Sequence, residues 1–503
     1  MKKILAVLLA VLMVASLFAG CANEKPAETT GEVANTTAAP AETTAPADTT
    51  AAPEEIVNLK WVSVGGGMPT NYEAWAVHLN EYLEEKIGVH LEMEIIGWGD
   101  WDTRRNMIVS TNEPYDIMFT NSSSYFNDVN IGAFMDIGEL VETAAPELVK
   151  FIPADYWNAC RINGKLYAVP TYKDSSHSQY FVYDKALVEE VYPEYKDAHT
   201  LAEAAPAVVA MSEKLGSPAL ILRKEGFNSI CGIKFDSMST GLDAIGVSYD
   251  DDPAHPKVVI TVEQDDLLDD LKILHDLYTN GYINSDAAIL DETPKYRAFN
   301  AAQGWPAAAQ TSWGPNMGTE AVAVQWQKTV LSNATVQGSM NCISAACEHP
   351  EKALQLLELV NTDPIVRDAL FYGLEGDNFD YVEAFGEQRV HKNNNDWNMA
   401  GYTQGSFFTV TPTDDMELNQ WEEVKALNEQ AHPSPILGFS FNPEPVSDEL
   451  AACVAIWKEY SATFLTGTDI DCISDMLEAM HNSGLDKVIA EAQSQIDEWV
   501  AAK

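Results

Sequence analysis

Residues 57–67 read VNLKWVSVGGG, and this stretch decides the fold that we expect for the chain. Its apolar and β-branched part, residues 57–64, predicts a strand, and the three glycines that follow end it. Residues 72–87 then carry apolar side chains at helical spacing, which predicts a helix. The same alternation continues with a strand over 89–96, a helix over 104–111 and a strand over 115–120. Strands that alternate with helices predict a parallel sheet with helices on its faces, which is an α/β fold.

The carboxyl ends of these strands are polar and aromatic, over residues 65–71, 98–101 and 121–125. Ligands of open α/β sheets lie beyond the carboxyl ends of the strands, so we expect a binding surface here. The glycines at 65–67 are not followed by Lys-Ser/Thr and do not complete Gly-x-Gly-x-x-Gly. A tight turn that lets the backbone approach a ligand is therefore favoured over a phosphate loop.

The first 21 residues predict where the protein works. Lys2 and Lys3 precede an apolar run over residues 4–15, and residues 17–21 read LFAGC. This is the pattern of a secretory signal, residues 1–20, that is closed by a lipobox, with Cys21 as the residue that becomes lipidated. An uncleaved anchor or an ordinary signal peptide are the alternatives, although the apolar run is short for a spanning helix.

Residues 21–55 consist mainly of Ala, Thr, Pro and Glu, which predicts a disordered tether. The folded part is expected over residues 56–503. About 450 residues are too many for a single hydrophobic core, so at least two lobes are expected.

The chain is strongly acidic, with 30 Lys and Arg against 76 Asp and Glu, a formal charge of −46. Such a surface is repelled by phosphate backbones, which argues against nucleic acid as a partner. Six cysteines follow Cys21, and their spacing matches no metal site. Disulfides, such as one between Cys342 and Cys347, and buried free thiols both remain open.

Two motifs carry a family resemblance. Residues 163–174 contain a Gly-Lys-x-Tyr-x-x-Pro turn, and residues 180–185 read YFVYDK. The pair resembles the first interlobe crossover of the extracellular solute-binding proteins related to maltose-binding protein. The resemblance implies a bilobed periplasmic-binding-protein-like fold of type II, in which two α/β lobes are joined by several hinge crossovers.

Later stretches resemble the same family in the same order. Residues 299–309 with 313–315 resemble the helix, glycine and alanine-rich strand that return the chain to the first lobe. Residues 339–344 with 349–353 resemble a strand followed by a Pro-Glu-Lys-Ala helix start. Five carboxyl-terminal stretches resemble the Gram-positive lipoprotein branch typified by LplA, with its distinct C-terminal module: 372–376, 438–441, 457–460, 484–486 and 491–495.

The resemblance also implies the lobe boundaries. The first lobe is expected over 56–172 and 308–372, and the second over 173–307 and 373–503, including a C-terminal helical module. Crossovers at 171–174, 308–313 and 371–375 are expected to act as hinges.

The function that the resemblance implies is capture of a solute, most often a carbohydrate or oligosaccharide, for an ABC importer. The expected partners are this ligand, the permease subunits, and the membrane through the N-terminal lipid only, for a monomer on the extracellular face of the cell membrane. No cofactor, no metal and no catalytic residue is expected. Aromatic rings stack on the apolar face of a pyranose, and polar side chains bind its hydroxyls. Residues of these types near the expected cleft form the candidate site: Asn71, Trp98, Asn121, Ser122, Tyr125, Tyr172, Asp174, Phe227, Trp313, Glu375, Asn378 and Trp397.

Other functions were weighed. A surface glycosidase needs two carboxylates at a set separation that a sequence cannot show, and Gly-x-Ser-x-Gly, His-Glu-x-x-His and phosphate-loop motifs are absent from the sequence. An adhesin would need exposed repeats, and peptides or polyamines remain alternative ligands. The acidic stretches 250–252 and 377–380 do not complete a calcium loop, which favours solvated loops.

Overall fold

The computed structural model describes residues 56–503, which belong to one compact unit. The signal segment, Cys21 and the tether lie outside the described residues. Among the described helices, none is both long enough and apolar enough to span a membrane.

The first lobe is built on a five-stranded sheet in the order β2-β1-β3-β13-β6. Its strands are β1 (Val57–Gly65), β2 (Val89–Gly97), β3 (Ile117–Thr120), β6 (Ala168–Pro170) and β13 (Met340–Ile343). β1 runs parallel to β2 in unbroken register from Val57↔Val89 to Gly65↔Gly97, and it also runs parallel to β3. β13 is antiparallel to both of its neighbours. The strand–helix alternation of the sequence therefore yields the parallel part of this sheet.

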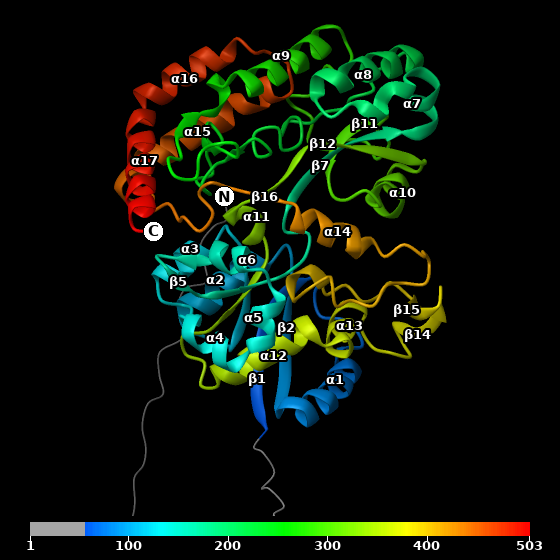
Figure 1. Ribbon diagram of the computed structural model, residues 1–503, viewed down its shortest axis with the longest axis vertical. Helices are drawn as coiled ribbons and strands as arrows, with labels where there is room; N and C mark the ends of the chain where they lie inside the picture. Colours follow the sequence, from blue (N-terminus) through cyan, green and yellow to red (C-terminus); the bar gives the residue numbers. More distant parts are fainter. Residues whose placement is uncertain (1–55) are drawn as a thin grey trace, which may run out of the picture. The chain divides into compact units, whose positions relative to one another are not determined.

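Helices cover the first sheet (Figure 1). α1 (Tyr72–Ile87) ends at Gly88, whose left-handed backbone lets its N–H donate to the carbonyl of Glu84. α12 (Pro350–Thr362) begins at the expected proline, and the Asp363 side chain caps α13 (Pro364–Tyr372). The remaining helices are α2 (Trp101–Thr111), α3 (Tyr125–Asn130), α4 (Gly138–Ala144), α5 (Pro146–Phe151) and α6 (Ala154–Ala159).

The second lobe holds a four-stranded sheet in the order β11-β7-β12-β16. Its strands are β7 (His177–Asp184), β11 (Phe299–Gln303), β12 (Ala321–Leu331) and β16 (His432–Pro433). A smaller antiparallel sheet consists of β8 (Phe235–Asp236), β9 (Ile245–Ser248) and β10 (Val258–Ile260). The helices of this part of the chain include α7 (Lys185–Val191), α8 (Leu201–Leu215) and α9 (Asp265–Thr279).

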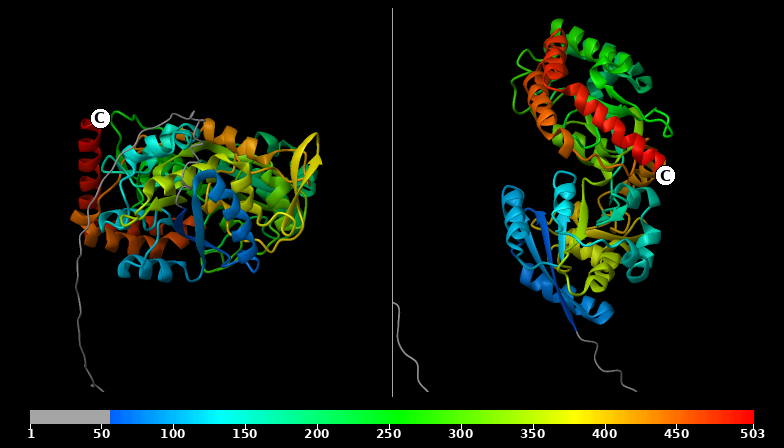
Figure 2. Two further views of the ribbon diagram at one scale, coloured as in Figure 1. Left: turned by 90° about the horizontal axis from the view of Figure 1, so that it is seen from below. Right: turned by 90° about the vertical axis from the view of Figure 1, so that its left-hand side faces the viewer.

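The chain ends in three helices, α15 (Ser447–Leu465), α16 (Cys472–Asn482) and α17 (Leu485–Ala501), drawn in orange and red in Figures 1 and 2. Trp457, Met476 and Ile496 belong to the same hydrophobic cluster as Phe181 of β7. The C-terminal helices thus share the core of the second lobe. A separate cluster around Trp61 forms the core of the first lobe.

The chain passes between the two sheets at three places within the described residues. Residues 171–176 join β6 to β7, as the Gly-Lys-x-Tyr-x-x-Pro motif predicts. Residues 332–339, with α11 (Asn333–Val336), join β12 to β13. The third passage runs through α14 (Gln420–Glu429) to β16, and Asn428 donates from Nδ2 to the carbonyl of Lys173 at 2.5 Å.

The lobe boundaries differ from the expected ones. The return to the first sheet comes at 332–339 and not at 308–313, because β12 pairs along β7 and buries Trp326 in the second lobe. The alanines at 307–309 are not a strand: β11 lies before them, and a π-turn over Ala309–Trp313 and α10 (Gly314–Met317) follow.

Residues 371–375 are not a crossover either. They lead into the hairpin of β14 (Phe379–Ala384) and β15 (Glu387–Lys392). Asn71 holds the loop before this hairpin on the first lobe, since its Nδ2 donates to Asp377 and Asn378 at 2.7 Å each.

The six described cysteines are all free thiols, and five of them are buried. Cys342 and Cys347 do not form a disulfide. The sequence left disulfides and buried free thiols open, and the structure shows buried free thiols.

Candidate functional site

Two aromatic rings are exposed side by side at the carboxyl edge of the first sheet. Trp98 directly follows β2, and Tyr402 lies in a single 3₁₀ turn over Gly401–Thr403. Their ring centroids are 6.1 Å apart and the planes differ by 10°. The side chains are 48% and 37% exposed, although most large aromatic residues of this chain are buried. The pair is an aromatic platform, a name that we keep for Trp98 and Tyr402.

Charged groups of the first crossover lie beside the aromatic platform. Lys173 Nζ is 5.8 Å from the centroid of the Tyr402 ring and 2.9 Å from Asp174 Oδ1. Burial and, after it, the negative charge of Asp174 raise the pKa of Tyr402. The first crossover thus brings a carboxylate and an ammonium group to the edge of an exposed aromatic surface.

A buried arginine holds the loop that carries Tyr402. Arg367 of α13 is fully buried; its Nε donates to the carbonyl of Ser406 at 2.5 Å and its Nη2 to that of Gly401 at 2.6 Å. Nη2 is also 3.3 Å from the carbonyl of Gly405. Burial lowers the pKa of Arg367 to about 9. Because the guanidinium satisfies these carbonyls, the loop over 401–406 is fixed before any ligand binds.

The glycines after β1 have a partner within the chain. A Cβ on Gly65 would lie 2.9 Å from the carbonyl carbon and oxygen of Met399, and the N–H of Gly66 donates to the carbonyl of Asn398 at 2.8 Å. The close approach that the glycines allow is therefore to the segment 398–399, and this corrects our expectation that a ligand lies there.

The second lobe presents polar side chains at the start of β7. Asn228 Nδ2 donates to Gln179 Oε1 at 3.1 Å, and Gln179 Nε2 lies 2.6 Å from Nε2 of His177. Burial lowers the pKa of His177 to about 4, so its imidazole is neutral at neutral pH. A neutral imidazole with its proton on Nδ1 accepts the hydrogen bond from the Gln179 amide.

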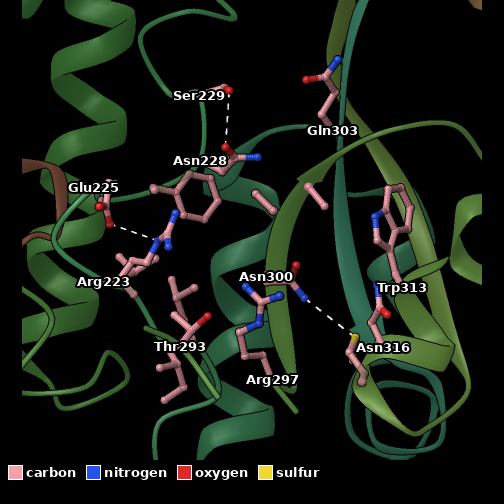
Figure 3. A pocket seen from close by; sticks show the side chains of 18 residues that line it. Arg223, Glu225, Asn228, Ser229, Thr293, Arg297, Asn300, Gln303, Trp313 and Asn316 are labelled. Carbon is pink, nitrogen blue, oxygen red and sulfur yellow. Dashed lines mark hydrogen bonds and ion pairs between the residues drawn. The ribbon is translucent and has the colours of Figure 1, made fainter. Parts of the chain in front are cut away.

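A cavity of about 520 Å³ lies within the second lobe, along the edge strand β11 (Figure 3). Trp313 lines it and packs on Tyr180, with ring centroids 5.6 Å apart. A Cβ on Gly304 would lie 2.6 Å from Cζ2 of Trp313, so the absence of a side chain at 304 allows the indole to lie where it does. The predicted residue Trp313 therefore faces a cavity.

Three of the predicted aromatic residues are core residues. Tyr125 is 1% exposed and donates its hydroxyl hydrogen to the carbonyl of Cys160 at 2.6 Å. Tyr172 packs edge-on against Tyr156 and Phe408 in the first lobe. Phe227 lines the cavity of the second lobe, but it is buried in the hydrophobic cluster of Phe181 and Trp326. Packing explains their positions without a ligand.

The remaining predicted residues do not line one common cavity. Asn121 accepts from the backbone and hydroxyl of Ser123, and Ser122 lines a cavity of about 170 Å³ between the lobes. Asn378 is buried and accepts from the N–H of Leu374, whereas Trp397 donates to the carbonyl of Leu370. Glu375 lines a cavity with Tyr82 and Tyr381 on the first lobe. Glu375, Asn378 and Trp397, which were expected in the second lobe, thus lie on the first lobe together with Asn71.

Sequence reasoning missed Tyr402, Lys173 and Arg367, and also Arg297, which lines the cavity along β11. The signal for Lys173 was present, because it precedes Asp174 in the first crossover. Tyr402 lies in an irregular loop without periodicity, so nothing local marks its exposure.

Residues 56–503 contain no group of three or more His, Cys, Asp or Glu side chains arranged to hold a metal ion. Asp250 pairs with Lys328, and Asp251 and Asp252 accept backbone N–H groups of their own loop. The acidic loop is satisfied by the protein itself.

Two α/β lobes with separate cores, three connecting segments and a platform of exposed aromatic rings beside the first of these segments are the features of a receptor that binds a solute between lobes. The model of the bacterial extracellular solute-binding proteins matches residues 79–371, and the chain belongs to this family. A second model, a domain of unknown function called DUF3502, matches residues 435–501, which include α15, α16 and α17.

Several solute-binding proteins are similar to this chain over most of its length. A carbohydrate ABC transporter substrate-binding protein of Streptococcus pneumoniae serotype 4 is 28% identical over 457 residues, which are 87% of this chain and 90% of that protein. The crystal structure of the N-glycan transport solute binding protein NgtS from Streptococcus pneumoniae matches with a TM-score of 0.79 at 26% identity, over 88% of this chain and 99% of NgtS. An HMO binding, ABC-transporter-associated solute binding protein from Bifidobacterium longum infantis shares the fold, with a TM-score of 0.61 at 16% identity over 88% of this chain and 99% of that chain.

Proposed function

We propose that this protein is a lipid-anchored receptor on the extracellular face of the cell membrane, which captures a carbohydrate between its lobes and delivers it to the permease subunits of an ABC importer. The observation that carries the proposal is the aromatic platform of Trp98 and Tyr402 beside Lys173 and Asp174. The C–H face of a pyranose stacks on exposed aromatic rings, and its hydroxyls hydrogen-bond to charged groups at the rim. Trp98 and Asp174 are among the ligand-binding residues that were predicted from the sequence.

The relatives support the class of ligand. NgtS has been solved in complex with Man1GlcNAc and with Man5GlcNAc, and the relative from Streptococcus pneumoniae serotype 4 is a carbohydrate ABC transporter substrate-binding protein. We therefore propose an oligosaccharide as the ligand, a monomeric receptor, and no enzymatic activity.

The relatives also support closure of the lobes on the ligand. This chain matches the structures of NgtS in complex with Man1GlcNAc and Man5GlcNAc with TM-scores of 0.69 and 0.66, against 0.79 for the first NgtS structure. One sequence with three different scores implies that NgtS changes conformation. We propose that residues 171–176 and 332–339 are hinges of the same motion here.

The test is a thermal-shift screen of the purified folded part, residues 56–503, against a panel with a mannose–GlcNAc oligosaccharide, kestose and a control peptide. A ligand that binds only the folded state raises the Tm with concentration. Small-angle scattering at saturation should then show a smaller radius of gyration. No shift with any glycan, or a shift with the peptide alone, would overturn the carbohydrate proposal, and cleaved oligosaccharide after incubation would overturn the absence of catalysis.

The proposed anchor has its own test. Cys21→Ala removes the thiol that would be linked to diacylglycerol, and each acyl CH₂ buried in a bilayer contributes about 0.8 kcal/mol. The variant should be released as soluble protein or remain as an unprocessed precursor. Lipid labelling that persists in the variant would contradict anchoring through Cys21.

A further inference from the structure

The cavity of about 520 Å³ in the second lobe has two walls of different character (Figure 3). One wall is the segment from Leu220 to Ser229, which carries Arg223 and Glu225. The other wall consists of β11 and the turn after it, with Asn300, Gln303, Trp313 and Asn316. Arg297 and Thr293 close one end. All of these residues belong to the second lobe, so this cavity is separate from the aromatic platform.

Arg297 is a charge without a partner. Among the residues that the structure describes, Arg297 forms neither an ion pair nor a hydrogen bond, and its Nε is buried without an acceptor. Leaving a buried guanidinium N–H unpaired costs more than leaving a neutral group unpaired. The chain carries 76 acidic residues against 30 Lys and Arg, so carboxylates are abundant, yet none pairs with Arg297.

A second cation lies nearby. Burial and, after it, the charge of Arg223 lower the pKa of Arg297. The Nε of Arg223 is 3.0 Å from Glu225 Oε2, and this pair is half exposed at the mouth of the cavity. The cavity is thus lined by one carboxylate, that of Glu225, and by two guanidinium groups, those of Arg223 and Arg297. Its charged side chains therefore have a net positive charge.

The opposite wall fits a sugar ring. Trp313 is kept against the strand by Gly304, which provides a fixed aromatic face. The Asn300 side chain is buried, and its Nδ2 has only a weak contact, 4.0 Å from Met317 Sδ. Gln303 and Asn316 add exposed amide groups at the rim. Amides both donate and accept hydrogen bonds, as hydroxyl recognition requires.

We propose that this cavity binds an acidic sugar, whose carboxylate or phosphate pairs with Arg297 while its ring lies on Trp313. An arginine fork matches the oxygens of either anion, and such charge-assisted bonds are the strong ones in a partly dry site. A neutral ligand would leave the guanidinium unpaired. That the ligand is a sugar rests on the proposed function, whereas the demand for an anion rests on the cavity alone.

The experiment is calorimetric titration of the described chain with glucuronate, glucose 6-phosphate and glucose. We expect at least one of the two anions to bind at least tenfold more tightly than glucose, and the preference to weaken as NaCl is raised. The tighter of the two anions identifies carboxylate or phosphate as the group that is bound. Equal affinity for glucose and both anions would overturn the proposal.

Variants test whether Arg297 causes the preference for an anion over glucose. Arg297→Gln should abolish the preference for the anion, Arg297→Lys should restore part of it, and Arg161→Gln, outside this cavity, should leave it unchanged. A preference that survives in Arg297→Gln would overturn the proposal. Binding of a mannose–GlcNAc oligosaccharide is measured in the parent protein, in these variants and in Trp98→Ala, and it separates the anion site from the proposed function. Loss of this binding only in Trp98→Ala concerns the platform, and its absence in the parent protein contradicts the proposed function but not the anion site.

Discussion

Arg367 and Arg297 are both arginines without a carboxylate partner in the described residues, but their surroundings are opposite. The Nε and Nη2 groups of Arg367 donate to three backbone carbonyls of one loop, and only Nη1 lacks an acceptor. Arg297 points into a cavity and donates to no described group. The difference teaches that the acceptors around a guanidinium group separate a structural arginine from one that is free to bind a ligand.

The largest effect is expected at Arg367. Arg367→Met removes the donors and leaves the carbonyls of Gly401, Gly405 and Ser406 unpaired in a buried loop. We expect the free energy of unfolding to fall by about 3–5 kcal/mol, as for other broken buried charge networks. Urea denaturation followed by circular dichroism measures this. Arg161→Met is the control, because it loses a single hydrogen bond, to the Gly164 carbonyl, at a more exposed position. The free energy of unfolding should fall by less than about 1 kcal/mol in this variant. Equal losses of unfolding free energy in Arg367→Met and Arg161→Met would show that Arg367 has no special structural role.

A pH titration extends the comparison to a buried base that stays neutral. The pKa of His177 is about 4 in the folded protein and about 6.5 in an unfolded chain. Between these values the unfolded chain binds a proton that the folded chain does not, so stability falls as the pH is lowered from about 6.5 to 4. The loss is up to about 3 kcal/mol, at 1.36 kcal/mol per pKa unit. His177→Gln should flatten the pH profile of the unfolding free energy in this window, and parallel profiles would show that His177 does not contribute.

The third prediction concerns the aromatic platform. Trp98→Ala and Tyr402→Ala should each lower the affinity for the glycan found in the screen by about tenfold, which corresponds to about 1.4 kcal/mol. Phe385→Ala, at an exposed hairpin turn away from the platform, is the matched control and should bind like the parent. Calorimetry gives the affinities, and circular dichroism confirms the fold. If the platform variants also bind like the parent, the cleft lies elsewhere.

The smallest effect on stability is expected at Arg297. Arg297→Gln removes a charge that has no protein partner, so the free energy of unfolding should change by less than about 0.5 kcal/mol or should rise. The same urea experiment measures it beside Arg367→Met. A loss of several kcal/mol would mean that Arg297 supports the fold after all, and the distinction between the two arginines would fail.

Much of the fold was predictable because its signals are local. The alternation over 57–120 and the helix start at Pro350 follow from patterns within a few turns of chain, whereas the crossover after Pro170 was implied by a motif that resembles the family's crossover. The assignment of later segments was less accurate. The run at 307–309 is apolar but forms no strand, and β12 was expected in the first lobe, since an apolar run does not specify which sheet it joins.

The sequence by itself determined the α/β class and the alternation of strands and helices over residues 57–120, because each depends on neighbouring residues, and the family resemblance of the motif at 163–174 located the first crossover. Only the tertiary structure decided that Trp98 lies beside Tyr402, that Gly65 and Gly66 make room for residues 398–399, and that Arg297 faces Trp313 across a cavity. These contacts join segments that are distant in sequence, and the packing of the whole chain sets them, which no local pattern records.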